Sequence, residues 1–208
     1  MLNELMQRYP ALADCREAIV AAEQMMMDTY CDGGKILVCG NGGSCADSDH
    51  IVGELMKGFL LMRRMDGATA DKFKAALGEE DAQVFIDKLQ GGIPAISLPS
   101  QSAVLSAYVN DVDPELMYAQ LVYGYARKGD MLIAISTSGN SKNAVAAAKV
   151  AKALGIRTLA LTGAKDSKLS AICDVTVKAP ETETFKIQEL HLPIYHYLCA
   201  SLEHKLFS

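Results

Sequence analysis

Five short apolar runs, each followed by a loop and a segment of helical pattern, constrain the fold of this chain more than any other feature of its sequence. Such runs, without alternating polar residues, are typical of strands buried on both faces of a parallel sheet. Strands that alternate with helices predict a sheet covered by helices on both sides, with right-handed crossovers. The runs that we predict to be strands are Lys35–Cys39, Pro94–Leu98, Met131–Ile135, Thr158–Leu161 and Val175–Val177.

Helical segments frame this predicted sheet. Apolar residues recur at helical spacing over 11–30, and a last helix is predicted from about Phe185 to Leu206. Residues 67–92 read as an insertion of two polar, helix-prone pieces separated by Gly78. We interpret the insertion either as a solvated helical flap or as a lid over a site. No repeat or linker indicates a second domain, so a single domain is predicted over 1–208.

The composition restricts the class of protein. The net charge is −5, from 20 basic and 25 acidic residues, and no basic stripe occurs, which argues against nucleic acid as the main partner. No apolar run reaches the roughly 18 residues that span a bilayer, and the N-terminus lacks the apolar segment of a signal peptide. The 6 cysteines show no CxxC spacing. We therefore expect reduced thiols, a cytoplasmic location, and no membrane or nucleic-acid partner.

The loop after the first predicted strand resembles a phosphate cradle. Gly40-Asn41-Gly42-Gly43 joins an apolar run to a segment of helical pattern, and Ser44 is predicted to cap that helix. A helix N-terminus offers free N–H groups and a positive dipole end, which suit a phosphate. Cys45 would lie near this terminus, where the pKa of a thiol can fall. The alternative is that the glycines only form a tight strand-to-helix connection.

A second candidate phosphate loop is Ser136-Thr137-Ser138-Gly139-Asn140-Ser141, which also lies between a predicted strand and a helix. Its four hydroxyl groups form a dense set of hydrogen-bond donors. Both loops would meet at the carboxyl ends of parallel strands, where such sheets bind ligands. Neither loop has the Walker A or the dinucleotide-binding pattern, so a sugar phosphate is favoured over a nucleotide. The alternative is a cluster of helix-capping residues.

A set of nitrogen and oxygen donors accompanies these loops. His50 and Glu54 are four residues apart on one predicted helix face, and the last helix carries Gln188, His191 and His196. His50, Glu54, Gln188 and His196 would suit Zn²⁺ or a similar divalent ion. A carboxylate base and an imidazole acid would equally suit proton transfer, and these two roles stay open. A structural role for His191 is an equal alternative.

Together these stretches resemble the sugar isomerase (SIS) domain family, and within it the phosphoheptose isomerases. The matching motifs are GNGGS at 40–44, H-x-x-x-E at 50–54, Asn110-Asp111, STSGNS at 136–141 and T-x-x-I-Q-E with the later histidines at 184–196. The resemblance implies a three-layer αβα sandwich of flavodoxin-like type with a five-stranded parallel sheet. It also implies a homotetramer, or at least a dimer, with sites between subunits.

The resemblance further implies a function. Phosphoheptose isomerases convert sedoheptulose 7-phosphate to D-glycero-D-manno-heptose 7-phosphate, an aldose–ketose exchange through an enediol(ate). By likeness, Glu54 is the base and His196 the acid, and zinc would be held by His50, Glu54, Gln188 and His196. The residues expected to bind the sugar phosphate are Asn41, Gly42, Gly43, Ser44, Asp111, Ser136, Thr137, Ser138, Ser141 and Gln188.

The chain departs from the family pattern at three places: Gly58 replaces an arginine, Phe185 replaces an aspartate, and the 67–92 insertion is longer than the usual connection. Two alternatives to an isomerase are considered. One is a non-catalytic SIS protein that binds a sugar phosphate or a replication initiator, and the other is a phosphosugar lyase or amidase. A binder is expected to lose the acid/base set, whereas Glu54 and His196 are both present, which favours an enzyme.

Overall fold

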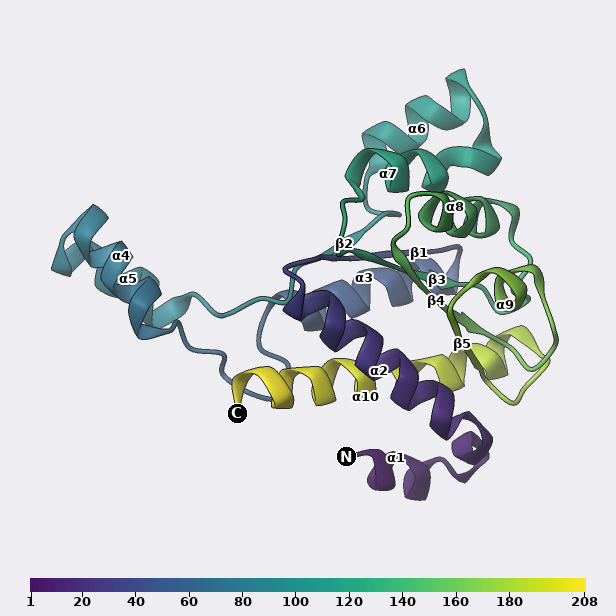
Figure 1. The fold of residues 1–208 in the computed structure, drawn as a ribbon, viewed down its shortest axis with the longest axis horizontal. Coiled ribbons are helices and arrows are strands. Elements are labelled where there is room, and N and C mark those ends of the chain that lie inside the picture. Colours follow the sequence, from purple (N-terminus) through teal and green to yellow (C-terminus); the bar gives the residue numbers. More distant parts are fainter.

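The computed structural model of the chain describes residues 1–208 and contains one sheet of five parallel strands in the order β2-β1-β3-β4-β5 (Figure 1). All five predicted strands are confirmed, and no bound differs by more than one residue. The strand order places β1 beside both β2 and β3, so the chain reverses its direction of winding at this point. The strands are β1 Ile36–Gly40, β2 Ala95–Ser97, β3 Met131–Ile135, β4 Arg157–Thr162 and β5 Val175–Lys178.

Helices cover both faces of the sheet, with α2, α3 and α10 on one face and α7 and α8 on the other (Figure 1). No helix is both long and apolar enough to cross a membrane. The α-helices are α1 Leu2–Arg8, α2 Arg16–Cys31, α3 Gly43–Met56, α4 Gly67–Leu77, α5 Glu79–Lys88, α6 Ser102–Asp111, α7 Met117–Tyr125, α8 Lys142–Ala153, α9 Lys168–Ile172 and α10 Thr184–Phe207. Two 3₁₀ helices, Pro10–Cys15 and Pro114–Leu116, precede α2 and α7.

The alternation of side chains along the strands creates two hydrophobic cores. Ile36 and Val38 point to a core of 25 buried residues beneath α2, α3 and α10. Leu37 and Cys39 point to the opposite core of 17 buried residues beneath α7 and α8. Because successive side chains of a strand face opposite sides, a strand between two helical layers must be apolar throughout. This explains the continuous apolar runs of the sequence.

Two details of the predicted helices are wrong. The helix predicted over 11–30 starts as a 3₁₀ turn, since Pro10 opens that turn and α2 begins only at Arg16. Ser44 does not cap α3, because the helix already begins at Gly43 and Gly42 occupies the cap position. Gly42 has φ +56°, a conformation that glycine adopts at little cost. The sharp turn out of β1 therefore requires glycine where a capping serine was expected.

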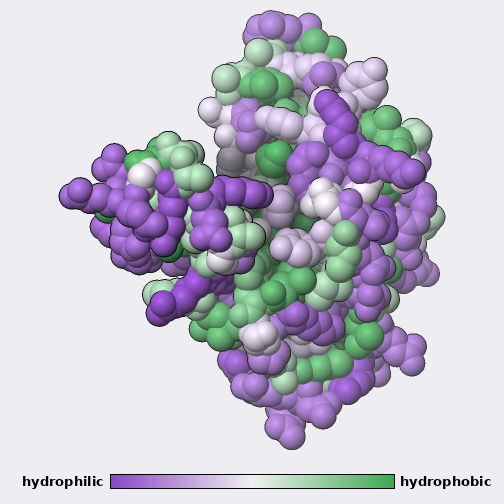
Figure 2. All heavy atoms as spheres, turned by 60° about the vertical axis from the view of Figure 1, so that its left-hand side comes forward, coloured by the Kyte–Doolittle hydropathy of each residue, from purple (hydrophilic) through white to green (hydrophobic).

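The insertion forms a helical arm that projects from the body of the protein (Figures 1 and 2). Its two helices, α4 and α5, pack on each other and are separated by Gly78, as predicted. An antiparallel bridge between Arg64 and Gln90 closes the base of the arm. Ala82 is the only buried residue of its helices. The arm follows the C-terminal end of α3, whereas the Gly42–Ser44 loop lies at the other end of that helix.

Candidate active site

The two predicted phosphate loops meet at the carboxyl ends of β1 and β3, where the winding of the sheet reverses. The two loops line an open pocket of about 360 Å³. The N-termini of α3 and α8 both end at this pocket, so two helix dipoles direct positive potential towards it. This arrangement suits a phosphate group. The pocket is lined by Asn41, Gly42, Gly43, Ser44, Ile135, Ser136, Thr137, Ser141, Thr184 and Gln188.

Hydroxyl groups of the second loop face one another in this pocket. The Oγ atoms of Ser136 and Ser141 are 2.9 Å apart. Ser141 precedes α8, but its side chain makes no capping hydrogen bond, which argues against the interpretation as a capping cluster. Ser138 Oγ instead accepts a hydrogen bond from the backbone N–H of Asn140, and its side chain does not line the pocket. Ser136 and Ser141 are therefore the best-placed hydroxyls for a ligand.

Gln188 of α10 closes the pocket from the opposite side. A Cβ atom at position 43 would lie 2.5 Å from Gln188 Nε2, closer than any real contact allows. The amide of Gln188 thus packs directly on the first turn of α3, and it would have to move aside if position 43 carried a side chain. The amide side chain can donate or accept hydrogen bonds at the mouth of the phosphate pocket.

The packing of α10 on α3 brings His50, Glu54 and His196 together. His50 Nε2 is 3.4 Å from Glu54 Oε1 and 3.4 Å from His196 Nε2. The rings of His50 and His196 meet edge to face, with centroids 4.9 Å apart. Phe59 lies on the other side of His196, with its centroid 5.5 Å from the imidazole. The carboxylate and both imidazoles therefore face a common region.

The surroundings of these groups shift their proton affinities. Burial, together with the nearby charge of His50, lowers the pKa of His196, although Glu54 opposes this shift. His196 is therefore neutral at neutral pH and keeps one N–H to donate. Burial and the charge of Asp47 raise the pKa of Tyr195, so its hydroxyl keeps its proton. Glu54 Oε2 is buried without a hydrogen-bond partner, and the ammonium of Lys57 lies 3.9 Å from it, so this oxygen carries a nearby positive charge but no hydrogen bond.

The same residues fit a divalent ion in type and in pairwise spacing. Donor atoms around a tetrahedral zinc ion lie about 3.3–3.4 Å apart, close to the two separations from His50 Nε2. The unpartnered Glu54 Oε2 adds a free oxygen ligand. However, no three His, Cys, Asp or Glu side chains are arranged around one point as a finished metal site. A bound ion therefore requires small side-chain adjustments, and Gln188 would have to leave its place against Gly43.

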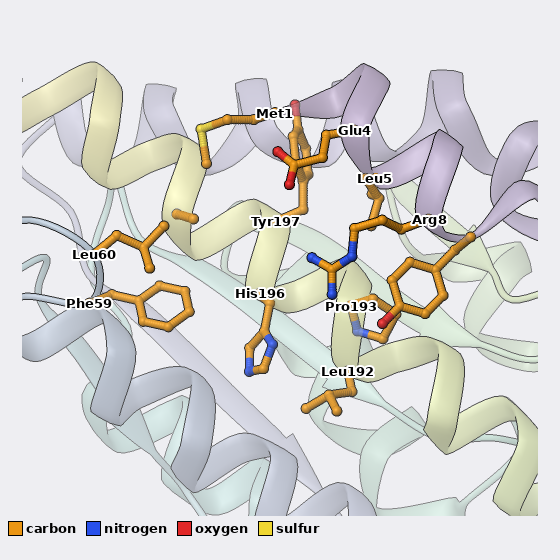
Figure 3. A pocket seen from close by; sticks show the side chains of 12 residues that line it. Met1, Glu4, Leu5, Arg8, Phe59, Leu60, Leu192, Pro193, His196 and Tyr197 are labelled. Atoms are coloured by element: carbon orange, nitrogen blue, oxygen red, sulfur yellow. The ribbon is translucent and has the colours of Figure 1, made fainter.

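A cavity of about 230 Å³ lies on the outer side of His196, between α1 and α10 (Figure 3). The guanidinium of Arg8 points from α1 towards the imidazole, and Phe59, Leu60 and Leu192 form apolar walls (Figure 3). The charge of Arg8 also contributes to the lowered pKa of His196. The cavity thus surrounds His196 with apolar walls and with the charged side chains of Glu4 and Arg8.

Some predicted residues are not brought to this region. Asp111 ends α6, is exposed, and does not line the pocket of its own chain. His191 is fully buried and lies 3.1 Å from the carbonyl oxygen of Thr162, and burial lowers its pKa to about 4, so it is a structural residue. The expectation of a lowered pKa for Cys45 is wrong, because burial and the charge of Asp49 raise it.

Four residues that support the site were not predicted from the sequence to belong to it. Tyr195 and Asp47 contact each other beside His50, and Arg63 and Glu203 form a buried ion pair beneath Glu54. Arg63 and Glu203 are charged residues within largely apolar stretches, which is a usable signal. The sequence around Tyr195 does not indicate a role in the site, because a tyrosine in an apolar helix is typical of a core.

The chain is similar to known proteins in both its sequence and its fold. The model of the SIS domain matches residues 101–199. The phosphoheptose isomerase of Aliarcobacter butzleri is 34% identical over 191 residues, which cover 92% of this chain and 87% of that protein. The solved structure of a phosphoheptose isomerase from Francisella tularensis superposes with a TM-score of 0.77 at 26% identity and covers 97% of this chain and 94% of that chain. For phosphoheptose isomerase GmhA from Neisseria gonorrhoeae, the TM-score is 0.73 at 28% identity, and the match covers 98% and 91% of the two chains.

Proposed function

Because this chain belongs to the phosphoheptose isomerases, a family of phosphosugar isomerases with the SIS domain, we propose that it interconverts sedoheptulose 7-phosphate and D-glycero-D-manno-heptose 7-phosphate. The observation that carries the proposal is the convergence of Glu54 and His196 on the helices that flank a phosphate-type pocket. A carboxylate and a neutral imidazole are the groups that an aldose–ketose exchange requires.

The phosphate group of the substrate is proposed to bind in the pocket at the N-termini of α3 and α8. The hydroxyls of Ser44, Ser136, Thr137 and Ser141 and the first N–H groups of both helices supply the donors. Ser138, whose hydroxyl does not line the pocket, contributes by shaping the loop, because its Oγ accepts a hydrogen bond from the backbone N–H of Asn140. Asn41 and Gln188, together with the glycine backbone at 42 and 43, then contact the sugar end. Glu54 lies about 16 Å along α3 from Gly43, further than a heptulose phosphate extends, so a phosphate bound in this pocket brings the reacting carbons to Glu54 and His196 only where the two parts of the site meet in an oligomer.

Glu54 is proposed as the base. It removes the proton from C1 of the ketose, and the electron pair of that C–H bond forms the double bond of the enediol(ate). The same carboxyl then returns the proton to C2, which gives the aldose. The buried and unpartnered Oε2 supports this role, because no protein hydrogen bond must break before it accepts a proton.

His196 is proposed to transfer protons to and from the substrate oxygens at C1 and C2. A neutral imidazole donates its N–H to the carbonyl oxygen at C2 as negative charge develops there, and a proton is recovered from the hydroxyl at C1. The lowered pKa supports donation from the neutral form. If zinc is bound, His50, Glu54, His196 and a displaced Gln188 would hold it, and it would polarise the substrate oxygens.

We also propose that the active site is completed in an oligomer, in line with the homotetramer expected from the family. Asp111 is expected to contact the sugar but does not reach the pocket of its own chain. A neighbouring copy whose Asp111 reaches this pocket would explain the discrepancy.

The 6 free cysteines support a reducing compartment such as the cytoplasm.

Exchange of the substrate proton with solvent tests the proposal directly. The protein is incubated with sedoheptulose 7-phosphate in D₂O, with and without zinc, and deuterium at C1 and the appearance of aldose are followed by NMR. We expect exchange and isomerisation, both reduced at least about 100-fold in Glu54→Gln. Glu80→Gln on the exposed arm is the matched control and should behave as the wild type.

The outcomes separate the isomerase from the sugar-phosphate binder. Exchange that persists in Glu54→Gln would remove Glu54 from the reaction. A folded protein that binds the heptulose phosphate but shows no exchange under either condition would establish the binding alternative. Exchange with only shorter ketose phosphates would keep the isomerase chemistry but overturn the proposed substrate.

A further inference from the structure

The hydroxyl of Tyr195 lies between two side chains of α3. It is 3.1 Å from Asp47 Oδ1 and 3.0 Å from His50 Nδ1. Tyr195 is almost completely buried, and its ring meets the imidazole of His50 edge to face at 5.4 Å. Asp47 Oδ2 has no hydrogen-bond partner, so the phenol is the one side-chain donor that this carboxylate has.

Counting the protons shared by Asp47, Tyr195 and His50 gives the direction of both hydrogen bonds of the phenol. Burial raises the pKa of Asp47, whereas the hydrogen bond from Tyr195 and the charge of His50 favour its ionised form. The ionised carboxylate can only accept, so the single proton of the phenol goes to Asp47. The phenol oxygen can then only accept from His50, and Nδ1 of His50 must carry a proton. A neutral imidazole has one N–H, so its other nitrogen, Nε2, is left with a free lone pair.

We propose that Asp47 and Tyr195 are positioning residues that hold His50 in the tautomer protonated at Nδ1, so that the lone pair of Nε2 faces Glu54 and His196. Nε2 is the atom that lies 3.4 Å from both Glu54 Oε1 and His196 Nε2. Two lone pairs, from Nε2 and from the carboxylate, then face one region, and a cation between them satisfies both. When no cation is bound, the same lone pair can instead accept from the N–H of His196.

The hydrogen bonds of Asp47, Tyr195 and His50 also show why the tautomer of His50 has to be held. Without Tyr195, His50 could protonate Nε2 and donate to Glu54 Oε1, and its lone pair would then no longer face the site. The benefit to catalysis rests on the proposed isomerase function. The tautomer itself does not, because it follows from the contacts of three side chains and can be observed without any substrate.

Nitrogen NMR of histidine-labelled protein tests the tautomer. Spectra are recorded at about pH 8, where an ordinary imidazole is neutral, and the signals of His50 are assigned with His50→Gln. We expect a protonated Nδ1 and an unprotonated Nε2 in the wild type, and a mixed or reversed pattern in Tyr195→Phe. Tyr197→Phe is the matched control, because it removes a phenol that donates to buried Glu23 on the same helix. It should leave the His50 signals unchanged.

Zinc titration and kinetics provide a second readout. Tyr195→Phe should bind zinc about 10- to 100-fold more weakly, because the partner that orients a ligating histidine is lost. Its kcat should fall by a similar factor with little change in KM, while Tyr197→Phe changes neither. If Tyr195→Phe does not fold, Asp47→Asn tests the same point, since an amide can donate to the phenol and release its proton towards Nδ1.

The proposal would be overturned by a wild-type His50 that is protonated at Nε2. It would equally be overturned by an unchanged tautomer in both Tyr195→Phe and Asp47→Asn. If the tautomer shifts as expected but no variant or wild type isomerises a sugar phosphate, the positioning role stands and the proposed function fails.

Discussion

The guanidinium Nε of Arg63 lies 2.7 Å from Glu203 Oε1, and both side chains are completely buried. The same guanidinium donates to the carbonyl oxygens of Leu55 and Glu54 in the last turn of α3, at 2.5 and 2.8 Å. These carbonyls have no partner within the helix, so Arg63 closes the helix end. The ion pair therefore fastens α10 to the turn of α3 that carries Glu54.

Glu203 completes this connection on its own side. Its carboxylate accepts hydrogen bonds from the backbone N–H groups of Phe59, Leu60 and Leu61. The segment after α3 is thereby folded around one buried carboxylate. Phe59, which contacts His196, belongs to this segment.

Removal of one partner of this buried pair should be strongly destabilising. We expect Glu203→Gln to lower the free energy of unfolding by about 3–5 kcal/mol, because the charge of Arg63 is left buried without compensation. Denaturant unfolding measures the change. Asp166→Asn is the control, since Asp166 pairs with Lys178 at the surface, and its loss should not be measurable. A Glu203→Gln variant as stable as this control would show that the pair is not important.

The pH dependence of stability should carry the signature of Glu203. Burial alone would raise its pKa, but hydrogen bonds from Phe59, Leu60 and Arg63 outweigh burial and lower the pKa below the ordinary 4.5. A lowered pKa stabilises the folded state above the unfolded value and loses this effect as pH falls through the folded value. The difference in unfolding free energy between wild type and Glu203→Gln should be constant above about pH 5 and shrink below it. A difference that grows on acidification would contradict this assignment.

Loss of a hydroxyl from the phosphate pocket should weaken substrate binding. We expect Ser141→Ala to raise KM about 10- to 100-fold with a smaller effect on kcat, because one hydrogen bond to a charged phosphate is worth about 1.5–3 kcal/mol. Ser138→Ala should act in the same direction. Ser106→Ala is the control, since Ser106 Oγ bonds only within α6. Equal KM values for Ser141→Ala and Ser106→Ala would place the phosphate elsewhere.

The helical arm should be dispensable for folding. Replacement of residues 66–89 by a short Gly-Ser linker should change the unfolding temperature by only a few degrees, because α4 and α5 bury only Ala82 and the Arg64–Gln90 bridge keeps the ends together. Ala82→Asp, which disrupts the arm alone, should give the same result. Failure of both variants to fold would show that the arm belongs to the core.

The same variants test the interpretation as a lid. The 14 residues of α3 span about 21 Å between the phosphate pocket and the base of the arm, so the arm does not cover the pocket of its own chain. We therefore expect kcat and KM to stay near the wild-type values. A selective loss of activity in the well-folded deletion would indicate that the arm reaches the site of a neighbouring copy.

Local patterns in the sequence determined the layout of the fold. The apolar runs predicted all five strands, because a strand between two helical layers is apolar on both faces. The Gly-rich and Ser-rich loops were placed at the same edge, since parallel strands end there together. The polar, helix-prone residues of the insertion and Gly78 between them predicted α4 and α5. Each of these features depends on residues that are close in sequence.

Only the tertiary structure decided how the helices bring distant side chains together. Tyr195 contacts Asp47 across 148 residues of sequence, and Arg63 contacts Glu203 across 140. No spacing pattern in the sequence predicts either contact. The donor set expected around one metal is divided, with Gln188 against Gly43 and His196 beside His50, because the two residues face different turns of α3. Sequence spacing fixes the face of a helix on which a side chain lies, whereas its partner depends on the rotation and height at which two helices pack.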